Sequence, residues 1–197
     1  MVPAEVTPRG RGQAVVIGGS AGSVVVLGEL LPGLPARFPP VLVVVHLPPS
    51  HPSLLVEIFA GRCAMRVREA EPFEKIERGS IYFAPSDYHL LVETDGSCAL
   101  SVGAPVHFSR PSIDVLFESA AYAYGTGLVA VVLTGASDDG ARGLAAVEAS
   151  GGVALVQEPE TAEVDTMPRA ALAAAPSAHV LSVSRLLSEL RVLGQDS

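Results

Sequence analysis

Short apolar runs alternate along the chain with longer stretches that have helical periodicity. Four runs rich in β-branched residues have the length of one buried strand each: 14–17, 41–45, 128–133 and 153–156. Between them, apolar side chains recur every three or four residues, as in a helix that packs one face on a core. The clearest stripe begins at Ile113, passes through Leu116, Phe117 and Ala120, and ends at Gly125. This alternation predicts an α/β fold with a doubly wound, mostly parallel, Rossmann-like sheet.

Further helices are predicted where apolar spacing is bounded by residues that start or stop a helix. One follows the glycine-rich turn at residues 18–23 and ends at Pro32 and Gly33. A second starts at residues 51–53 and ends at Gly61. The remaining helices are expected at 141–149, after Pro168, and through the leucines of 186–193.

The segment 65–100 interrupts this alternation. Its short apolar runs, 81–83, 90–92 and 98–100, are separated by proline, glycine and aspartate residues that are typical of tight turns. Short strands joined by tight turns often pair with their neighbours in the chain. We therefore expect an antiparallel hairpin insertion in this segment.

Composition indicates a short arm followed by a single domain. Residues 1–13 contain Pro3, Pro8, Gly10 and Gly12 among charged residues, without the apolar core of a signal peptide. We expect this arm to be disordered. Of the whole chain, 49% is apolar and 17% is charged, a balance that allows one sizeable core. Residues 14–197 are therefore predicted to form a single domain.

Charge and cysteine content narrow the range of partners and locations. The formal net charge is −8 and no basic run is present, which disfavours nucleic acid and anionic membranes as partners. The apolar runs are much shorter than the roughly 20 residues that span a bilayer, so no direct membrane insertion is expected. Cys63 and Cys98 lack neighbours at zinc-site spacing. We expect reduced, buried thiols in a soluble, cytoplasmic protein.

Three loops that follow predicted strands carry the residues of a nucleophilic site. Residues 18–22 fit the pattern G-x-S-x-G, a sharp strand-to-helix turn that exposes the hydroxyl of Ser20. His46 follows the second predicted strand, and Asp138 and Asp139 follow the third. Because the carboxyl ends of parallel strands meet at one edge of a sheet, we expect these side chains to lie close together.

A serine, a histidine and an aspartate together make a nucleophile for acyl transfer. The imidazole accepts the serine proton, and the carboxylate orients the imidazole and stabilises its charged form. Backbone N–H groups of the two glycine-rich turns would stabilise an oxyanion. The residues alone leave His89 and His107 as competitors for the base, and either Asp138 or Asp139 as the carboxylate.

Simpler interpretations exist for each of these features. The glycine-rich turn could bind phosphate or a nucleotide at the helix N-terminus. However, its glycines do not follow G-x-G-x-x-G, and His46 stands where a dinucleotide-binding protein has an acidic residue. Asp138 or Asp139 could be a helix N-cap, and His46 could be a hydrogen-bonded structural residue. The conjunction of the three residue types favours catalysis.

Six motifs follow one another along the chain: 17–22, 45–49, 81–85 with 89–90, 110–117 with 119–121, 133–135 with 139–141, and 167–169. In this order they resemble the catalytic domain of the bacterial chemotaxis protein-glutamate methylesterases (CheB-type). The similarity extends from about residue 14 to about residue 190.

This resemblance implies a reaction and a role for each residue. Ser20 would be the nucleophile, His46 the general base and Asp139 the carboxylate that orients it. These enzymes remove methyl esters from glutamate side chains on the cytoplasmic helices of methyl-accepting chemoreceptors, and many also deamidate receptor glutamines. No metal or organic cofactor is implied. The family's N-terminal receiver domain would be absent, because few residues precede the first predicted strand.

The predicted substrate and oxyanion region consists of Ala21, Gly22, Gly135 and Ala136, and it departs from the family pattern. Ala21 replaces a threonine, and Ala136 and Ser137 replace a methionine and a glycine. Ser23 replaces a glycine of the first turn, and the segment 161–166 lacks an aromatic residue and a glycine. These departures leave an alternative open, in which the chain is a weakly active or inactive regulatory or adaptor domain that binds a receptor or signalling protein.

Overall fold

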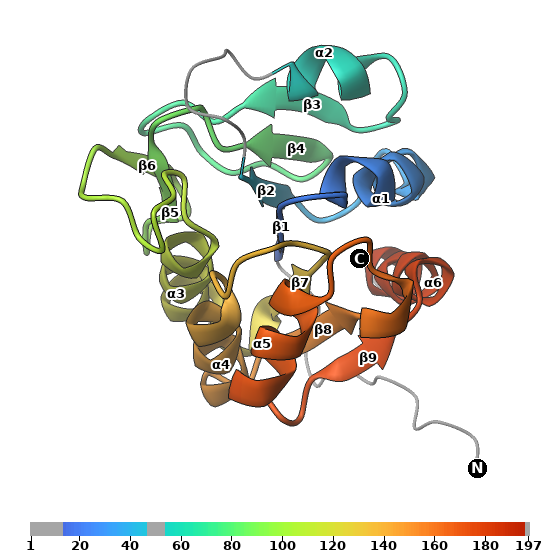
Figure 1. Ribbon diagram of the computed structural model, residues 1–197. Coiled ribbons are helices and arrows are strands. Elements are labelled where there is room, and N and C mark those ends of the chain that lie inside the picture. Colours follow the sequence, from blue (N-terminus) through green and yellow to red (C-terminus); the bar gives the residue numbers. More distant parts are fainter. Residues whose placement is uncertain (1–13, 47–53, 196–197) are drawn as a thin grey trace.

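A seven-stranded parallel sheet forms the centre of the molecule, with helices on both faces (Figure 1). The computed structural model describes residues 14–46 and 54–195. Every pair of neighbouring strands in this sheet is parallel. In spatial order the strands are β3 (Arg66–Glu69), β4 (Ser80–Phe83), β2 (Val41–Val45), β1 (Ala14–Gly19), β7 (Leu128–Val132), β8 (Val153–Gln157) and β9 (His179–Leu181). The predicted doubly wound α/β class is confirmed.

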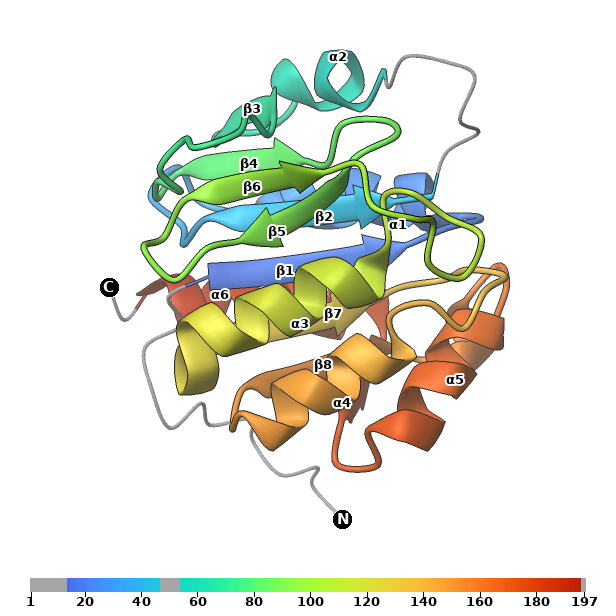
Figure 2. The ribbon, with the colours of Figure 1, turned by 90° about the vertical axis from the view of Figure 1, so that its left-hand side faces the viewer.

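Two helical layers cover the sheet, one on each side of it in Figure 1, and Figure 2 looks onto the layer that lies on the left in Figure 1. One face packs against α3 (Ile113–Tyr124), α4 (Ala141–Ala149) and α5 (Thr166–Ala174). The other face packs against α1 (Ser23–Leu30), α2 (Leu55–Ala60) and α6 (Val183–Gln195). Short 3-10 turns occupy Leu31–Gly33, Gly125–Gly127 and Pro159–Thr161.

Burial on both faces explains why the central strands are apolar without interruption. In β1, Ala14 and Val16 pack into the core beneath α3 and α4, whereas Val15 and Ile17 pack into the core beneath α1 and α6. A strand that faces solvent on one side would alternate apolar and polar residues, but a strand between two helical layers does not.

The hairpin prediction is confirmed in part. Strands β5 (His89–Val92) and β6 (Cys98–Ser101) form a separate antiparallel pair that packs against α3. Residues 81–83, however, belong to β4 in the main sheet, so the prediction that all of 65–100 is a hairpin insertion was wrong. Strand β4 is buried on both faces and pairs with Val41–Val43, far away in the sequence. Burial of its apolar side chains between helical layers favours this pairing over pairing with the chain neighbour.

The edge strands β3 and β9 were not predicted individually. Strand β3 has the sequence RVRE and none of its residues is fully buried. Strand β9 is only three residues long. Such strands have little apolar patterning, and they form because a neighbouring strand offers hydrogen-bonding groups along its edge.

The order of the strands brings three loops together. Strand β1 has β2 as its neighbour on one side. The chain later returns and forms β7, which is the neighbour of β1 on the other side. Loops at such a topological switch point diverge and leave a crevice. Backbone hydrogen bonds continue beyond the strands here: the N–H of His46 donates to Gly19 (3.1 Å), and the N–H of Ser20 donates to Thr134 (3.0 Å).

Several sequence predictions lie at the limits of the described residues. The expected disordered arm at 1–13 and the expected helix start at 51–53 lie outside them. Across residues 14–46 and 54–195, no helix is both long and apolar enough to span a membrane. Both cysteines are free thiols; Cys98 is buried, as predicted, whereas Cys63 is half-buried.

Candidate active site

Ser20 lies in the tight turn between β1 and α1. Gly22, the residue before α1, has a φ of 79°, a left-handed conformation that glycine adopts without steric cost. Gly18 is required for a different reason, because a Cβ atom there would collide with the side chain of Ile113 on α3. The turn leaves Ser20 partly exposed at the edge of the sheet, as expected for a nucleophile at a G-x-S-x-G elbow.

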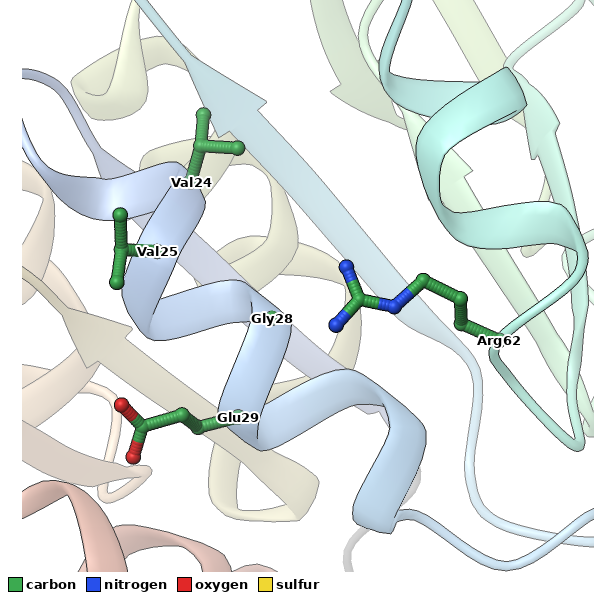
Figure 3. A pocket seen from close by; sticks show the side chains of 5 residues that line it. All are labelled: Val24, Val25, Gly28, Glu29 and Arg62. Carbon is green, nitrogen blue, oxygen red and sulfur yellow. The ribbon is translucent and has the colours of Figure 1, made fainter.

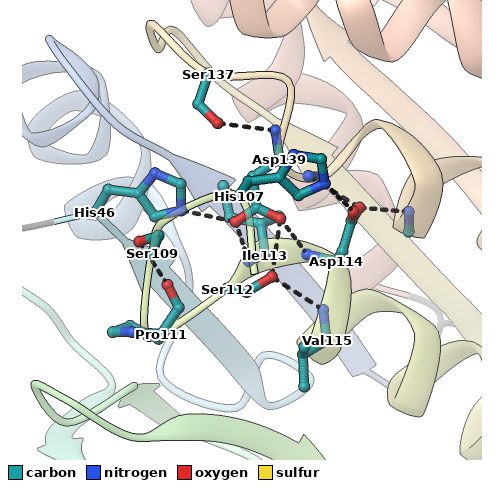
Figure 4. Close-up of polar contacts among 12 residues, drawn as sticks. His46, His107, Ser109, Pro111, Ser112, Ile113, Asp114, Val115, Ser137 and Asp139 are labelled. Atoms are coloured by element: carbon teal, nitrogen blue, oxygen red, sulfur yellow. Dashed lines mark hydrogen bonds and ion pairs between the residues drawn. The ribbon is translucent and has the colours of Figure 1, made fainter. Parts of the chain in front are cut away.

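His46 and Asp139 form a hydrogen-bonded pair beside this turn (Figure 4). The distance from His46 Nε2 to Asp139 Oδ2 is 2.8 Å, and the Asp139 side chain is fully buried. The backbone of His46 is bonded to Gly19, the residue before Ser20. Because Asp139 occupies Nε2, Nδ1 is the ring nitrogen that remains to accept a proton from a nucleophile.

The Asp139 carboxylate accepts four hydrogen bonds. Besides His46, its donors are the Ser112 hydroxyl (2.9 Å), the Ile113 N–H (2.7 Å) and the Asp114 N–H (2.9 Å). These donors form the first turn of α3, where N–H groups lack partners within the helix and the helix dipole favours a negative charge. Asp139 is therefore held rigidly while it orients the imidazole.

These hydrogen bonds determine the charge state of Asp139. Burial by itself would raise the pKa of this carboxyl group. The hydrogen bond from His46 and the N–H groups of Asp114 and Ile113 outweigh burial and hold the pKa below its ordinary value. Asp139 is therefore ionised at neutral pH and can stabilise an imidazolium on His46.

Asp114 gives α4 the same support that Asp139 gives α3. Its Oδ1 accepts hydrogen bonds from the N–H groups of Gly140 (3.0 Å) and Gly143 (2.7 Å) at the start of α4. The two helices thus cap each other reciprocally, with one buried carboxylate at each N-terminus. Burial raises the pKa of Asp114, and the nearby Asp139 adds to the rise; the Gly143 N–H, Arg142 and His107 only partly oppose it.

The other candidate bases and acids have different partners. His89 is buried, with Nε2 3.0 Å from the Ala104 carbonyl and Nδ1 accepting the Ser112 N–H (3.1 Å), so it supports the start of α3. His107 lies 2.9 Å from Asp138, which is largely exposed. The N-cap residue of α4 is Gly140, so neither Asp138 nor Asp139 is the N-cap of that helix. The geometry therefore pairs His46 with Asp139 rather than with Asp138.

Residues of the predicted oxyanion region differ in the availability of their N–H groups. The Gly135 N–H donates to the Val164 carbonyl (3.0 Å) and is therefore occupied. Ala21 and Ala136 are exposed, and no hydrogen bond among the described residues engages their N–H groups. Gly135 still shapes the region, since a Cβ atom there would lie 2.9 Å from that of Ser20.

Thr134 connects the loops that surround Ser20. Its hydroxyl lies 3.0 Å from the carbonyl oxygen of Ala21 and accepts the Val164 N–H (2.9 Å). Its own N–H donates to the side chain of Gln157, which is buried (2.9 Å). The elbow, the loop after β7 and the loop before α5 are therefore fixed relative to one another.

One group of side chains has the spacing of a metal site. Ligand atoms of His107, Asp114 and Asp139 lie within 4.8 Å of one another. However, each Asp139 oxygen already accepts two hydrogen bonds, and the Arg142 guanidinium lies 3.8 Å from Asp114 Oδ2. Only His107 and Asp114 remain as ligands, and the Arg142 guanidinium lies next to them. A zinc site in a protein uses more protein ligands than two. The donor set does not fit a resident metal.

A pocket of about 370 Å³ lies between α1 and the Arg62 side chain, and neither His46 nor Asp139 lines it (Figure 3). It is lined by Val24, Val25, Gly28, Glu29 and Arg62. These side chains include a cation and a carboxylate but no nucleophile with an adjacent base. The pocket is therefore not a candidate for the reaction.

The first turn of α3 is the part of the site to which the sequence analysis assigned no role. Ser112, Ile113 and Asp114 lie in a recognised motif, but their contacts to Asp139 come from a distant part of the chain. A serine directly before an amphipathic stripe does signal a helix N-cap, and Ser112 is the N-cap of α3. That signal marks the helix terminus but not the carboxylate that binds there.

Comparisons with known proteins agree with one another. Residues 15–190 match the family model described as CheB methylesterase. A Leptospira interrogans protein, named as a candidate protein-glutamate methylesterase/protein-glutamine glutaminase, is 43% identical over 175 residues, which cover 88% of this chain and 91% of that protein. A Symbiobacterium thermophilum enzyme with the same activities in its name is 37% identical over 92% of this chain, which spans about half (51%) of that enzyme. The crystal structure of the Thermotoga maritima CheB methylesterase catalytic domain superimposes with a TM-score of 0.88 at 32% identity, covering 92% of this chain and 98% of that one.

Proposed function

This chain belongs to the CheB methylesterase family, and on that premise we propose that Ser20, His46 and Asp139 catalyse its protein-glutamate methylesterase/protein-glutamine glutaminase reaction. The observation that carries the assignment is the His46–Asp139 pair (2.8 Å) beside the serine elbow. Asp139 is buried, ionised and held by four donors, as the orienting carboxylate of a triad requires.

The proposed mechanism passes through an acyl-enzyme. His46 Nδ1 accepts the proton of the Ser20 hydroxyl while the Oγ atom of Ser20 attacks the carbonyl carbon of the glutamate methyl ester. The imidazolium, stabilised by Asp139, returns the proton to the departing methoxide, and methanol leaves. Water then attacks the acyl-enzyme with His46 as base, which releases the glutamate carboxylate and regenerates Ser20. With a glutamine side chain, the first leaving group is ammonia.

Oxyanion stabilisation is proposed for the N–H groups of Ala21 and Ala136. Both residues are exposed beside Ser20, and among the described residues neither N–H group has a hydrogen-bond acceptor. A backbone donor requires no particular side chain, so alanine can replace the threonine and methionine of the family pattern here.

Ser137 also supports an active enzyme over an inactive adaptor. Its hydroxyl accepts the N–H of Asp139 (3.0 Å), so this departure from the family pattern adds a contact to the catalytic loop. Ser23 is buried, and its hydroxyl donates to the Ser20 carbonyl (2.6 Å). Both substitutions are therefore compatible with a well-ordered site.

The family further suggests the substrate, the location and the extent of the domain. We propose that the substrates are the methylated cytoplasmic helices of chemoreceptors and that the protein acts in the cytoplasm. The reaction would be carried by one catalytic domain, residues 14–197, with no nucleic-acid partner and no organic cofactor.

Methanol release from a methylated chemoreceptor fragment tests this proposal. Wild-type protein should release methanol, Ser20→Ala should release none, and Ser188→Ala on the exposed face of α6 should match the wild type. Thermal unfolding of each variant verifies folding. Binding of the fragment by wild-type protein without methanol release would contradict an esterase and support the adaptor alternative.

A further inference from the structure

A tight turn with an unusual backbone lies next to the site. Val106 and Ser109 exchange backbone hydrogen bonds (3.0 and 2.8 Å), and the two residues between them, His107 and Phe108, have φ values of 48° and 61°. Two-residue hairpin turns with positive φ at both central positions usually contain asparagine and glycine, because most side chains disfavour a positive φ. A histidine and a phenylalanine at these positions store conformational strain, and such strain is concentrated at functional sites.

The His107 ring holds this turn against Asp138 and Asp114, the neighbours of the site. Nδ1 lies 2.9 Å from the exposed Asp138, and Nε2 lies 3.2 Å from Oδ2 of the buried Asp114. Among the described residues that buried Asp114 oxygen accepts no hydrogen bond, and its closest nitrogen groups are the His107 ring and, at 3.8 Å, the Arg142 guanidinium. Asp138 precedes Asp139 directly, and the ring lies within 4.8 Å of the Asp139 carboxylate.

Arg110 fixes the loops on the other side of the turn. Its Nη1 donates to the carbonyl oxygens of Val102 and Gly103 (2.9 Å each), and its Nη2 donates to Asp87 (2.6 Å). The loop after β4, the loop after β6 and the turn are thereby held together. Figure 2 shows these loops at the edge of the sheet where β1, β2 and β4 end.

This arrangement displays apolar side chains to solvent. Phe108 is fully exposed at the tip of the turn, Val102 is 69% exposed and Tyr88 is 41% exposed. We call Phe108, Val102 and Tyr88 the apolar rim. Phe108 buries almost nothing within the fold, so the strained turn does not contribute to the core. Aromatic side chains on rigid backbone are, however, the residues that most often dominate protein interfaces.

We propose that Phe108 is a specificity-determining residue that docks on an apolar stripe of the receptor helix beside the esterified glutamate. The inference rests on the proposed function, and it adds a named contact outside the triad. The occupant follows from continuity with the site: His107, the neighbour of Phe108, contacts Asp138 and lies within 4.8 Å of the Asp139 carboxylate, so the turn borders the site at which the ester would react. A rigid turn loses little entropy when the helix binds.

Phe73 offers a matched control for Phe108. It is also a phenylalanine, is 86% exposed and has a positive φ of 67°. Its N–H donates to Cys98, which pairs with Val92 at the end of the hairpin opposite His89. Phe73 is therefore equivalent in exposure and backbone conformation but lies away from the site.

The experiment separates docking from catalysis. In a Ser20→Ala background, Phe108→Ala should raise the Kd for a methylated receptor fragment about tenfold or more, as loss of an interface hot spot does. Phe73→Ala should leave the Kd within about twofold, and Phe108→Leu should restore part of the affinity. In the active protein, Phe108→Ala should raise KM with little change in kcat.

The possible results are distinguishable. Equal Kd values for the Phe108→Ala and Phe73→Ala variants would overturn the docking role, as would a loss of kcat without a change in KM. Failure of the proposed function has another signature: wild-type protein would release no methanol, whatever the Kd values. Equal melting temperatures of the two alanine variants would exclude a general folding defect.

Discussion

Asp139→Asn removes one negative charge from the position where α3 and His46 meet. The carboxylate accepts two hydrogen bonds at each oxygen, from His46 and Ile113 at Oδ2 and from Ser112 and Asp114 at Oδ1. An amide has only one accepting atom. Whichever way the amide turns, its NH₂ group faces a backbone N–H of α3 that cannot act as an acceptor.

The size of the effect follows from these contacts. A hydrogen bond to a charged group contributes about 1.5–3 kcal/mol, and a buried donor left without an acceptor costs about 1–3 kcal/mol. We expect the free energy of unfolding to fall by about 2–4 kcal/mol. The wrong tautomer of the histidine and the uncompensated imidazolium should lower kcat by about 10³–10⁴-fold, as in other Ser-His-Asp enzymes.

The pH dependence provides a second signature of the same contacts. Because the folded-state pKa of Asp139 is lowered, its contribution to stability is present above the unfolded pKa of about 3.9 and is lost as pH falls through the folded pKa. The difference in unfolding free energy between wild type and Asp139→Asn should therefore be constant near neutral pH. It should shrink in acid.

Urea unfolding and methanol release measure both effects, and Asp138→Asn is the control. Asp138 is adjacent in sequence but 67% exposed, so its substitution should change stability and kcat only slightly. An Asp139→Asn enzyme with kcat within about tenfold of the wild type would refute the triad assignment. Equal unfolding free energies for the two variants would refute the reasoning on the start of α3.

Two further predictions concern the helix pair that carries the site. Asp114→Asn retains an oxygen for the N–H groups of Gly140 and Gly143. The raised pKa of Asp114 means that its contribution to stability is complete below the unfolded pKa of about 3.9 and is lost as pH rises through the folded pKa. Urea unfolding should therefore show a variant at least as stable as the wild type at pH 7, with an advantage that shrinks toward pH 4; a pH-independent loss would contradict this. Gly143→Ala should destabilise by about 1–3 kcal/mol although alanine favours helices, because its Cβ would lie 2.6 Å from that of Phe117 and 3.0 Å from the Asp114 Cα. A raised urea midpoint for that variant would show that the two helices separate easily.

Local patterns in the sequence were sufficient for the central elements and for the three strand ends that carry the site. β-Branched runs, helical stripes and the glycine-rich elbow each report on burial or backbone conformation within a few residues. The rule that parallel strands end at one edge then predicts that Ser20, His46 and the Asp138–Asp139 pair lie together.

Only the tertiary structure decided which neighbours these residues have. Asp138 and Asp139 are indistinguishable by local pattern, yet one is exposed beside His107 and the other is buried against His46 and the start of α3. Strand β4 likewise joined the main sheet because a distant strand, β2, offered a buried edge. The physical reason is common to both cases: sequence pattern determines whether a residue is buried or turns the chain, whereas the partner of a buried polar group or strand edge depends on packing between segments far apart in the chain.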